Sequence, residues 1–127
     1  MRKNLTALAL LLPLVACAAD EAPQSLRGKE FTANVEGTTI TLNFAADENR
    51  VFGQVVNRYN GPYEISGGKI KFGMFASTMM MGINETAMRV EREFFKFMPM
   101  VESYKLSGNE LLLKASDGQK MTFEQMN

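Results

Sequence analysis

FTANVEGTTITLNF, residues 31–44, is the stretch that decides the fold class of this 127-residue chain. In its second half, apolar side chains at positions 40, 42 and 44 alternate with polar ones at 39, 41 and 43. Alternation with a period of two places each kind of side chain on its own face of a strand. Glu36-Gly37 interrupts the pattern, and a glycine supplies the positive φ that a tight hairpin turn needs. The stretch therefore predicts two antiparallel strands joined by a short turn.

Outward from this hairpin, similar short segments and turn dipeptides continue toward the C-terminus. The further turns that we expect are Glu48-Asn49, Asn60-Gly61, Gly67-Gly68, Gly108-Asn109 and Asp117-Gly118. Residues 69–74 and 120–124 repeat the alternation of apolar and polar side chains. A sheet with one apolar face must curl or be covered, and eight strand-like segments are enough for a small barrel. The prediction is a mainly β (α+β) domain, a small antiparallel, barrel-like β-meander.

One segment, residues 84–98, breaks this pattern and predicts a helix. Its sequence NETAMRVEREFFKFM places apolar residues three and four positions apart. Asn84 is a suitable N-cap, and Pro99 ends the helix in this prediction. We expect the helix to pack on the barrel or plug it with its phenylalanines. Binding of this apolar face to a membrane or to a partner helix is the alternative.

The composition excludes several classes of function. The chain has no His, no Trp and only one Cys, so zinc sites, Cys–His dyads and Ser–His–Asp triads are out of reach. Fourteen basic side chains balance fourteen acidic ones, unlike the basic surface of a nucleic-acid binder. Catalysis by carboxylates is the enzymatic chemistry that remains possible. It needs positioned partners, and the sequence shows no second acid that would pair with the first. We therefore expect one non-enzymatic domain with no metal, no cofactor and no nucleic-acid partner.

The N-terminal residues have the pattern of an export signal. Arg2 and Lys3 precede the apolar run Leu5–Val15. This run is shorter than the roughly 20 residues that span a bilayer as a helix. We therefore expect a leader that directs export, and a mature protein without a transmembrane helix.

The junction after the leader centres on Cys17. Leu14-Val15-Ala16-Cys17 resembles the lipobox of bacterial lipoproteins, in which cleavage precedes a cysteine that is then acylated. Two or three acyl chains would hold the protein at the membrane, since each buried methylene contributes roughly 0.8 kcal/mol. Ordinary secretion with cleavage after Ala18 is the alternative, and an uncleaved leader is a further one. We expect a lipoprotein signal peptide over residues 1–16, a lipid-anchored tether over 17–28 and the folded domain over 29–127.

Three stretches carry a resemblance to a known family. VFGQVVNRYNGPYEISGGKIKFGMFASTMMM (51–81), MRVEREFF (88–95) and SYKLSGNELLLKASDGQKMTF (103–123) together resemble the META domain of heat-shock protein HslJ-like lipoproteins. The resemblance covers about residues 26–125. Its motif positions are Gly53, Asn57, Gly61, Tyr63, Ala76, Thr78, Glu91 and Phe94. It implies a small β-barrel with a helix, a role in envelope stress or antibiotic tolerance, and no established catalytic activity.

The chain departs from the family pattern at two positions. The family usually has a cysteine just before the motif asparagine and another three positions after the motif threonine. Val56 and Met81 stand there in this chain, so any disulfide or thiol chemistry of that pair is absent. Because both residues are apolar, we expect them to be buried in contact, with packing in place of the bridge.

Three motif side chains are candidates for a polar site. Asn57 and Tyr63 flank the predicted turn at residues 60–62, where they would line the mouth of a ligand site. The interpretation that we favour is structural: the Asn57 amide satisfies loop backbone groups and the Tyr63 ring packs. Glu91 is the acid of the family motif, and we expect it to hydrogen-bond a sheet edge or a turn.

Methionines are concentrated in one part of the chain. Seven of the ten lie between Met74 and Met100. We favour a role as core filler, because Met adapts to irregular gaps. An adaptable apolar pocket and a thioether site for Cu(I) are the alternatives. These methionines also make an exported domain sensitive to oxidants.

The expected function is that of a non-enzymatic lipoprotein of the cell envelope that binds an envelope protein or an apolar molecule. Ala18 after the cysteine favours the outer membrane, with the domain facing the periplasm; a secreted, soluble periplasmic protein is the alternative. A carrier of lipid or another apolar ligand in the barrel interior is the second hypothesis. A structural pilot for an outer-membrane complex is a third, by analogy of fold alone. A cavity of several hundred Å³ inside the barrel would favour the carrier.

Overall fold

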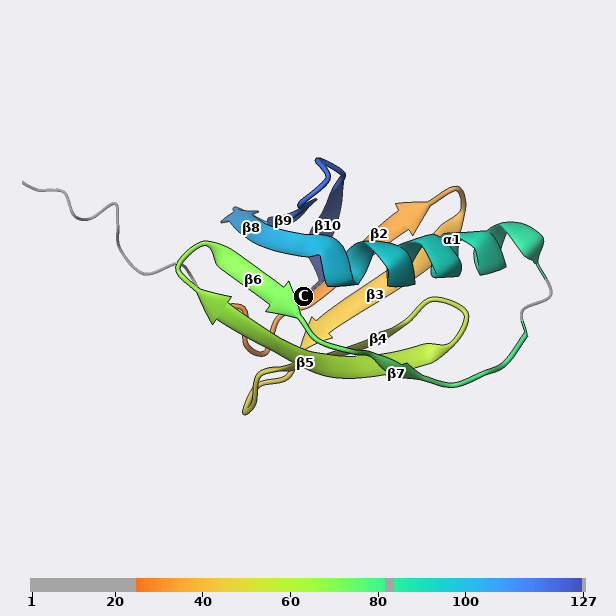
Figure 1. Cartoon of the computed structure of the whole chain (residues 1–127), viewed down its shortest axis with the longest axis horizontal. Coiled ribbons are helices and arrows are strands. Elements are labelled where there is room, and N and C mark those ends of the chain that lie inside the picture. Colours follow the sequence, from red (N-terminus) through yellow and green to blue (C-terminus); the bar gives the residue numbers. More distant parts are fainter. Residues whose placement is uncertain (1–24, 82–83, 127) are drawn as a thin grey trace, which may run out of the picture.

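Eight antiparallel strands close into a barrel in the computed structural model, which describes residues 25–81 and 84–126 (Figure 1). The strands are β2 (Glu30–Val35), β3 (Thr38–Phe44), β4 (Arg50–Gln54), β5 (Arg58–Ser66), β6 (Lys69–Phe72), β8 (Val101–Ser107), β9 (Glu110–Ala115) and β10 (Lys120–Met126). They follow the order β4-β3-β2-β10-β9-β8-β6-β5, and β5 pairs back to β4. A short strand, β7 (Ala76–Ser77), adds to β5. The predicted mainly β, barrel-like fold is confirmed.

The hairpin predicted over residues 31–44 is formed by β2 and β3. β2 and β3 pair from Glu30↔Asn43 to Val35↔Thr38. Glu36 and Gly37 form the turn with φ of 52° and 85°, in the left-handed region that tight hairpins require. Ile40, Leu42 and Phe44 are buried, because the alternation of β3 turns them inward.

The turn predicted at Asn60-Gly61 is wrong. β5 runs straight through these residues, and the chain reverses earlier, at residues 55–57 between β4 and β5. Gly61 is buried inside the strand, and the ring of Phe75 lies so close that a Cβ on Gly61 would be 2.3 Å from its Cδ1. The glycine therefore admits an aromatic ring against the backbone, which is a second reason for Gly within a strand.

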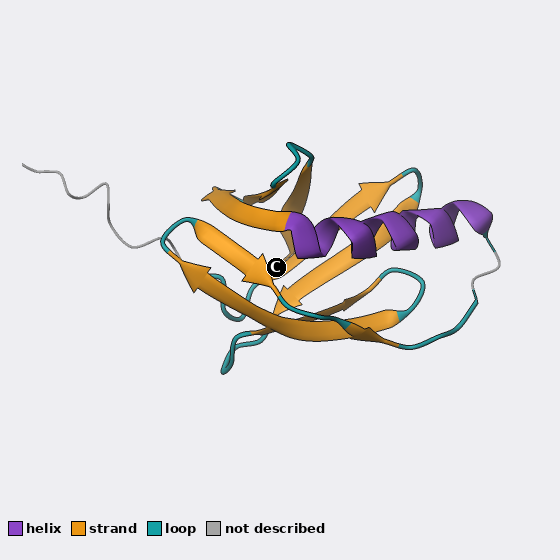
Figure 2. Cartoon of the chain, in the orientation of Figure 1, coloured by secondary structure: helices purple, strands orange, loops and turns teal. Residues whose placement is uncertain are grey.

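The predicted helix is confirmed as α1 (Glu85–Phe97), and Figure 2 shows it lying across the strands. The Asn84 side chain caps it by accepting from the Ala87 backbone N–H at 3.2 Å. The α-helix ends at Phe97, before Pro99 as predicted, and Pro99 itself lies within a 3₁₀ turn, η2 (Met98–Met100). Val90, Phe94 and Phe97 are buried in the barrel core, so the helix packs on the barrel as expected. Within the described residues, no helix combines the length and hydropathy that crossing a bilayer requires.

A single apolar cluster fills the barrel. Among the described residues, twenty buried apolar side chains form it, and all but one of them lie in the strands, α1 or η2. Leu26 is one of them, 2% exposed, although it falls within the expected tether over residues 17–28. The backbone N–H of Gly28 also donates to Phe44 O at 2.9 Å. The folded body therefore includes residues 26–28; the expected signal peptide and Cys17 lie outside the described residues.

Candidate functional site

Asn57 is the centre of a buried polar network, which we call the Asn57 network. It is the last residue of the β4–β5 turn and is 4% exposed. Its Oδ1 accepts from Thr78 Oγ1 at 2.9 Å and from the Met80 backbone N–H at 2.6 Å. Its Nδ2 donates to Met80 O at 3.0 Å and to Glu91 Oε2 at 2.9 Å. The amide therefore uses both donors and both acceptor positions, as a buried Asn must.

Glu91 brings α1 into the same network. It is 6% exposed, and its Oε1 accepts from the backbone N–H groups of Val56 and Asn57 at 3.0 and 2.6 Å. A buried carboxyl group is tolerated when hydrogen bonds replace its lost water. The expected contact of Glu91 with a turn is present, and it joins helix and turn through three N–H donors.

An aromatic cluster lies next to this network. The ring of Phe75 rests over Gly61 and stacks on Tyr59, with ring centroids 5.1 Å apart. Phe94 of α1 contacts Tyr59 with centroids 5.3 Å apart. Of the motif residues, Gly61 therefore leaves space for the Phe75 ring, and Phe94 contributes a ring of its own. These rings pack between α1, β5 and the residues that lead into β7.

Gly53 and Tyr59 make a close contact with β3. Tyr59 donates its hydroxyl to Thr41 O at 2.7 Å. A Cβ on Gly53 would lie 2.1 Å from that same oxygen, so only glycine lets the strands approach there. Burial raises the pKa of the Tyr59 hydroxyl far above its ordinary value. The hydroxyl therefore remains a donor at every physiological pH.

Tyr63 lies apart from the Asn57 network. Its ring packs edge-on against Phe44 with centroids 5.3 Å apart, and against Phe72. Burial, together with the neighbouring Tyr63, raises the pKa of Tyr104. Asn57 and Tyr63 therefore do not share a ligand mouth, and each has the structural environment that we favoured.

Residues 74–81, which we call the methionine segment, are joined to the Asn57 network at residue 80 and carry four exposed methionines. Met74 and Met79 are each 90% exposed, Met81 is 85% exposed and Met80 is 60% exposed. The core-filler interpretation is wrong for these four, whose side chains are exposed on either side of β7, where the chain pairs along the edge of β5. It holds for Met98, which is fully buried in η2.

The expected buried contact between Val56 and Met81 is also wrong. Val56 is half-buried and Met81 is exposed. Hydrogen bonds of the neighbouring Asn57 with residue 80, rather than apolar packing, join the two segments here.

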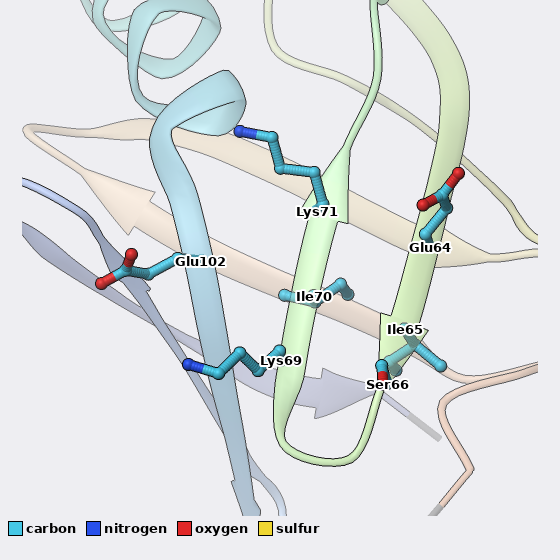
Figure 3. A pocket seen from close by; sticks show the side chains of 7 residues that line it. All are labelled: Glu64, Ile65, Ser66, Lys69, Ile70, Lys71 and Glu102. Atoms are coloured by element: carbon cyan, nitrogen blue, oxygen red, sulfur yellow. The ribbon is translucent and has the colours of Figure 1, made fainter.

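A shallow groove of about 320 Å³ opens on the outer surface between β5, β6 and β8 (Figure 3). β6 and β8 pair only at Lys69↔Ser103, next to an irregularity in β8 at residues 101–103. This irregularity contains Glu102, which lines the groove. Figure 3 shows the complete lining: Glu64, Ile65, Ser66, Lys69, Ile70, Lys71 and Glu102. Sequence analysis missed it, although the exposed Lys69 and Lys71 alternate on β6.

No group of three or more His, Cys, Asp or Glu side chains that could hold a metal ion occurs among residues 25–81 and 84–126. The carboxyl group of Glu91 is occupied by backbone and amide donors. The arrangement around Asn57 thus fixes the position of a loop and a helix, and it presents thioethers to solvent.

Comparison with known proteins supports the assignment made from the motifs. The META domain family model matches residues 22–127. An NMR structure of a protein from Burkholderia xenovorans matches with a TM-score of 0.71 at 19% identity, covering 100% of this chain and 99% of that one. A second NMR structure matches with a TM-score of 0.63 at 20% identity, covering 78% of this chain and 90% of that one. None of the curated proteins matches. The solved structures share the fold, and the family match shows that this chain belongs to the META domain family.

Proposed function

We propose that the chain is a non-enzymatic lipoprotein of the cell envelope whose META domain is an interaction module. The observation that carries the proposal is the methionine segment, whose exposed thioethers stand beside the buried Asn57 network. Clustered exposed apolar side chains are typical of interaction sites, and flexible methionines adapt to varied apolar partners. A network that holds the backbone of such a segment in place favours a role for the segment in binding.

The placement of this segment suits a protein anchored near its N-terminus. Leu26 and Gly67 line the same hollow, so the described chain begins beside the β5–β6 turn. Figure 1 shows this turn at one end of the molecule and the start of α1, toward which the residues after β7 run, at the other. An acyl anchor on Cys17 would therefore leave the methionine segment directed away from the membrane, toward a periplasmic partner. Resemblance to the HslJ-like lipoproteins adds envelope stress or antibiotic tolerance as the setting.

The carrier hypothesis has less support. A carrier needs space inside the barrel, whereas twenty apolar side chains form one cluster there. The groove between β5, β6 and β8 and three other hollows have volumes of about 140–370 Å³. All four are open to solvent and lined largely by exposed residues. Packing of the interior favours binding at the surface.

The proposal is tested by separating the segment from the rest of the surface. In a strain that lacks its own copy, we expect the double variant Met79→Ser/Met81→Ser to lose stress tolerance while its melting temperature is unchanged. Met126→Ser is the matched control, because Met126 is an exposed methionine on β10. Full tolerance in the double variant would overturn the proposed role of the segment.

The anchor needs its own measurement. Mass spectrometry of the processed protein should show acyl chains on Cys17, and Cys17→Ser should leave the membrane fraction. An unmodified thiol would remove the lipoprotein part of the proposal and leave the secreted alternative.

A further inference from the structure

The thioethers of the methionine segment differ sharply in exposure from those of the core. Met74, Met79 and Met81 are 85–90% exposed, whereas Met98 is fully buried. Oxidation of a thioether requires contact between its sulfur and the oxidant, so accessibility sets the order of reaction. The segment therefore offers at least three reactive sulfurs within eight residues of chain.

The segment is held without the help of these sulfurs. β7 pairs with β5 at Tyr59↔Ser77 and Asn60↔Ala76, and the Thr78 backbone N–H donates to Arg58 O at 3.0 Å. The Asn57 amide binds the backbone N–H and C=O of residue 80. All these anchors are backbone groups or polar side chains other than methionine. Adding oxygen to the exposed sulfurs leaves each of them in place.

We propose that the methionine segment is a site of reversible oxidation by peroxide-type oxidants, and that this modification regulates binding. The regulatory part rests on the proposed function. A sulfur lone pair attacks one peroxide oxygen and the O–O bond breaks. The departing hydroxide takes the proton from the transferred oxygen and leaves as water. Sulfur loses two electrons to the peroxide and becomes a sulfoxide, which a methionine sulfoxide reductase returns to the thioether as two thiols form a disulfide and water is released.

The consequence for the surface follows from the chemistry of the product. A sulfoxide is polar and accepts hydrogen bonds, so oxidation converts an apolar surface into a hydrated one. The same change at Met98 would place a polar group in the core and destabilise the barrel. The exposed and buried methionines are thus expected to respond to oxidant in opposite ways: one changes the surface, the other the fold.

The chemical test uses the purified full chain and graded hydrogen peroxide. Trypsin separates the two classes, because peptide 72–89 carries the methionine segment with Met88 and peptide 97–105 carries Met98 with Met100. We expect the sulfurs of Met74, Met79 and Met81 to oxidise at least roughly tenfold faster than that of Met98. The melting temperature should then shift by less than about 2 °C, and a reductase should restore the original masses. Equal rates for Met98, or unfolding that accompanies oxidation of the segment, would overturn the proposal.

The regulatory test uses glutamine as a polar, uncharged substitute for the sulfoxide. The quadruple variant Met74→Gln/Met79→Gln/Met80→Gln/Met81→Gln should keep its melting temperature and lose stress tolerance, which is the effect that we expect of oxidation. Full tolerance in this variant would exclude regulation by oxidation. If the double variant Met79→Ser/Met81→Ser also retains tolerance, the proposed function fails as well, whereas the order of oxidation by peptide mapping is independent of either result.

Discussion

Glu91 on α1 accepts hydrogen bonds from Asn57 at both carboxyl oxygens, from the backbone nitrogen to Oε1 at 2.6 Å and from Nδ2 to Oε2 at 2.9 Å. These two residues are 34 positions apart in the chain. The pair joins the helix to the β4–β5 turn, and Asn57 in turn binds the backbone at residue 80. The position of the methionine segment therefore depends on the contact between α1 and the β4–β5 turn.

Replacing Glu91 with Gln tests this relationship. The glutamine amide would present a donor to donors of Asn57 or Val56, so at least one buried N–H would lose its partner. We expect Glu91→Gln to lower the free energy of unfolding by about 2 kcal/mol. Urea denaturation measures it. Glu93→Gln is the control on the same helix, since Glu93 is exposed and its ion pair with Arg89 at 3.6 Å contributes little. Equal stability of both variants would contradict the role of Glu91.

The network should also respond as one unit. Asn57→Ala removes four side-chain hydrogen bonds and leaves the Glu91 carboxyl partly unsatisfied, so we expect a loss of about 2–3 kcal/mol. The double variant Asn57→Ala/Glu91→Gln should lose less free energy of unfolding than the two single variants lose together, because both single changes break the same hydrogen bond. A double-mutant cycle by urea denaturation measures the coupling. Strict additivity would show that the two side chains act independently.

Gly61 provides a test of the aromatic cluster. Gly61→Ala places a methyl group 2.3 Å from Cδ1 of Phe75, and the ring must leave its stack on Tyr59. We expect a loss of about 1–3 kcal/mol from this overpacking. Gly68→Ala is the matched control, because a Cβ there meets nothing within 4 Å. Thermal melts that coincide for the two variants would contradict the assigned role of Gly61.

Local patterns predicted the barrel because strand alternation and the helical period are properties of neighbouring residues. The β2–β3 hairpin and the Asn84 cap follow from such short-range signals. Gly61 misled the prediction, since a glycine for turning and a glycine for close approach look the same in a sequence. Only the fold brings Phe75 over it.

The candidate site was less predictable for a related reason. The motif named Asn57, Thr78 and Glu91, but their hydrogen bonds join segments more than twenty residues apart. Hydropathy favours burial of a methionine, so the exposure of residues 79–81 could not be deduced from the sequence. Leu26 shows the opposite error: its small and polar neighbours indicated a tether, whereas its side chain is buried in the barrel core.

Because Tyr59 is buried, the stability of the protein should depend on pH in the alkaline range. Burial raises its pKa in the folded state above the ordinary value of about 10 of the unfolded chain. The folded protein therefore retains a proton that the unfolded chain releases above about pH 10, so the contribution of Tyr59 is complete below that pH and declines above it. Tyr59→Phe removes the bond to Thr41 O and should cost about 1 kcal/mol near neutral pH. Its stability should then fall less steeply than that of the wild type above about pH 10, with the remaining slope due in part to Tyr104, whose pKa is also raised by burial. Urea denaturation across this pH range measures both effects, and parallel curves for the two proteins would show that Tyr59 ionises freely in the folded state.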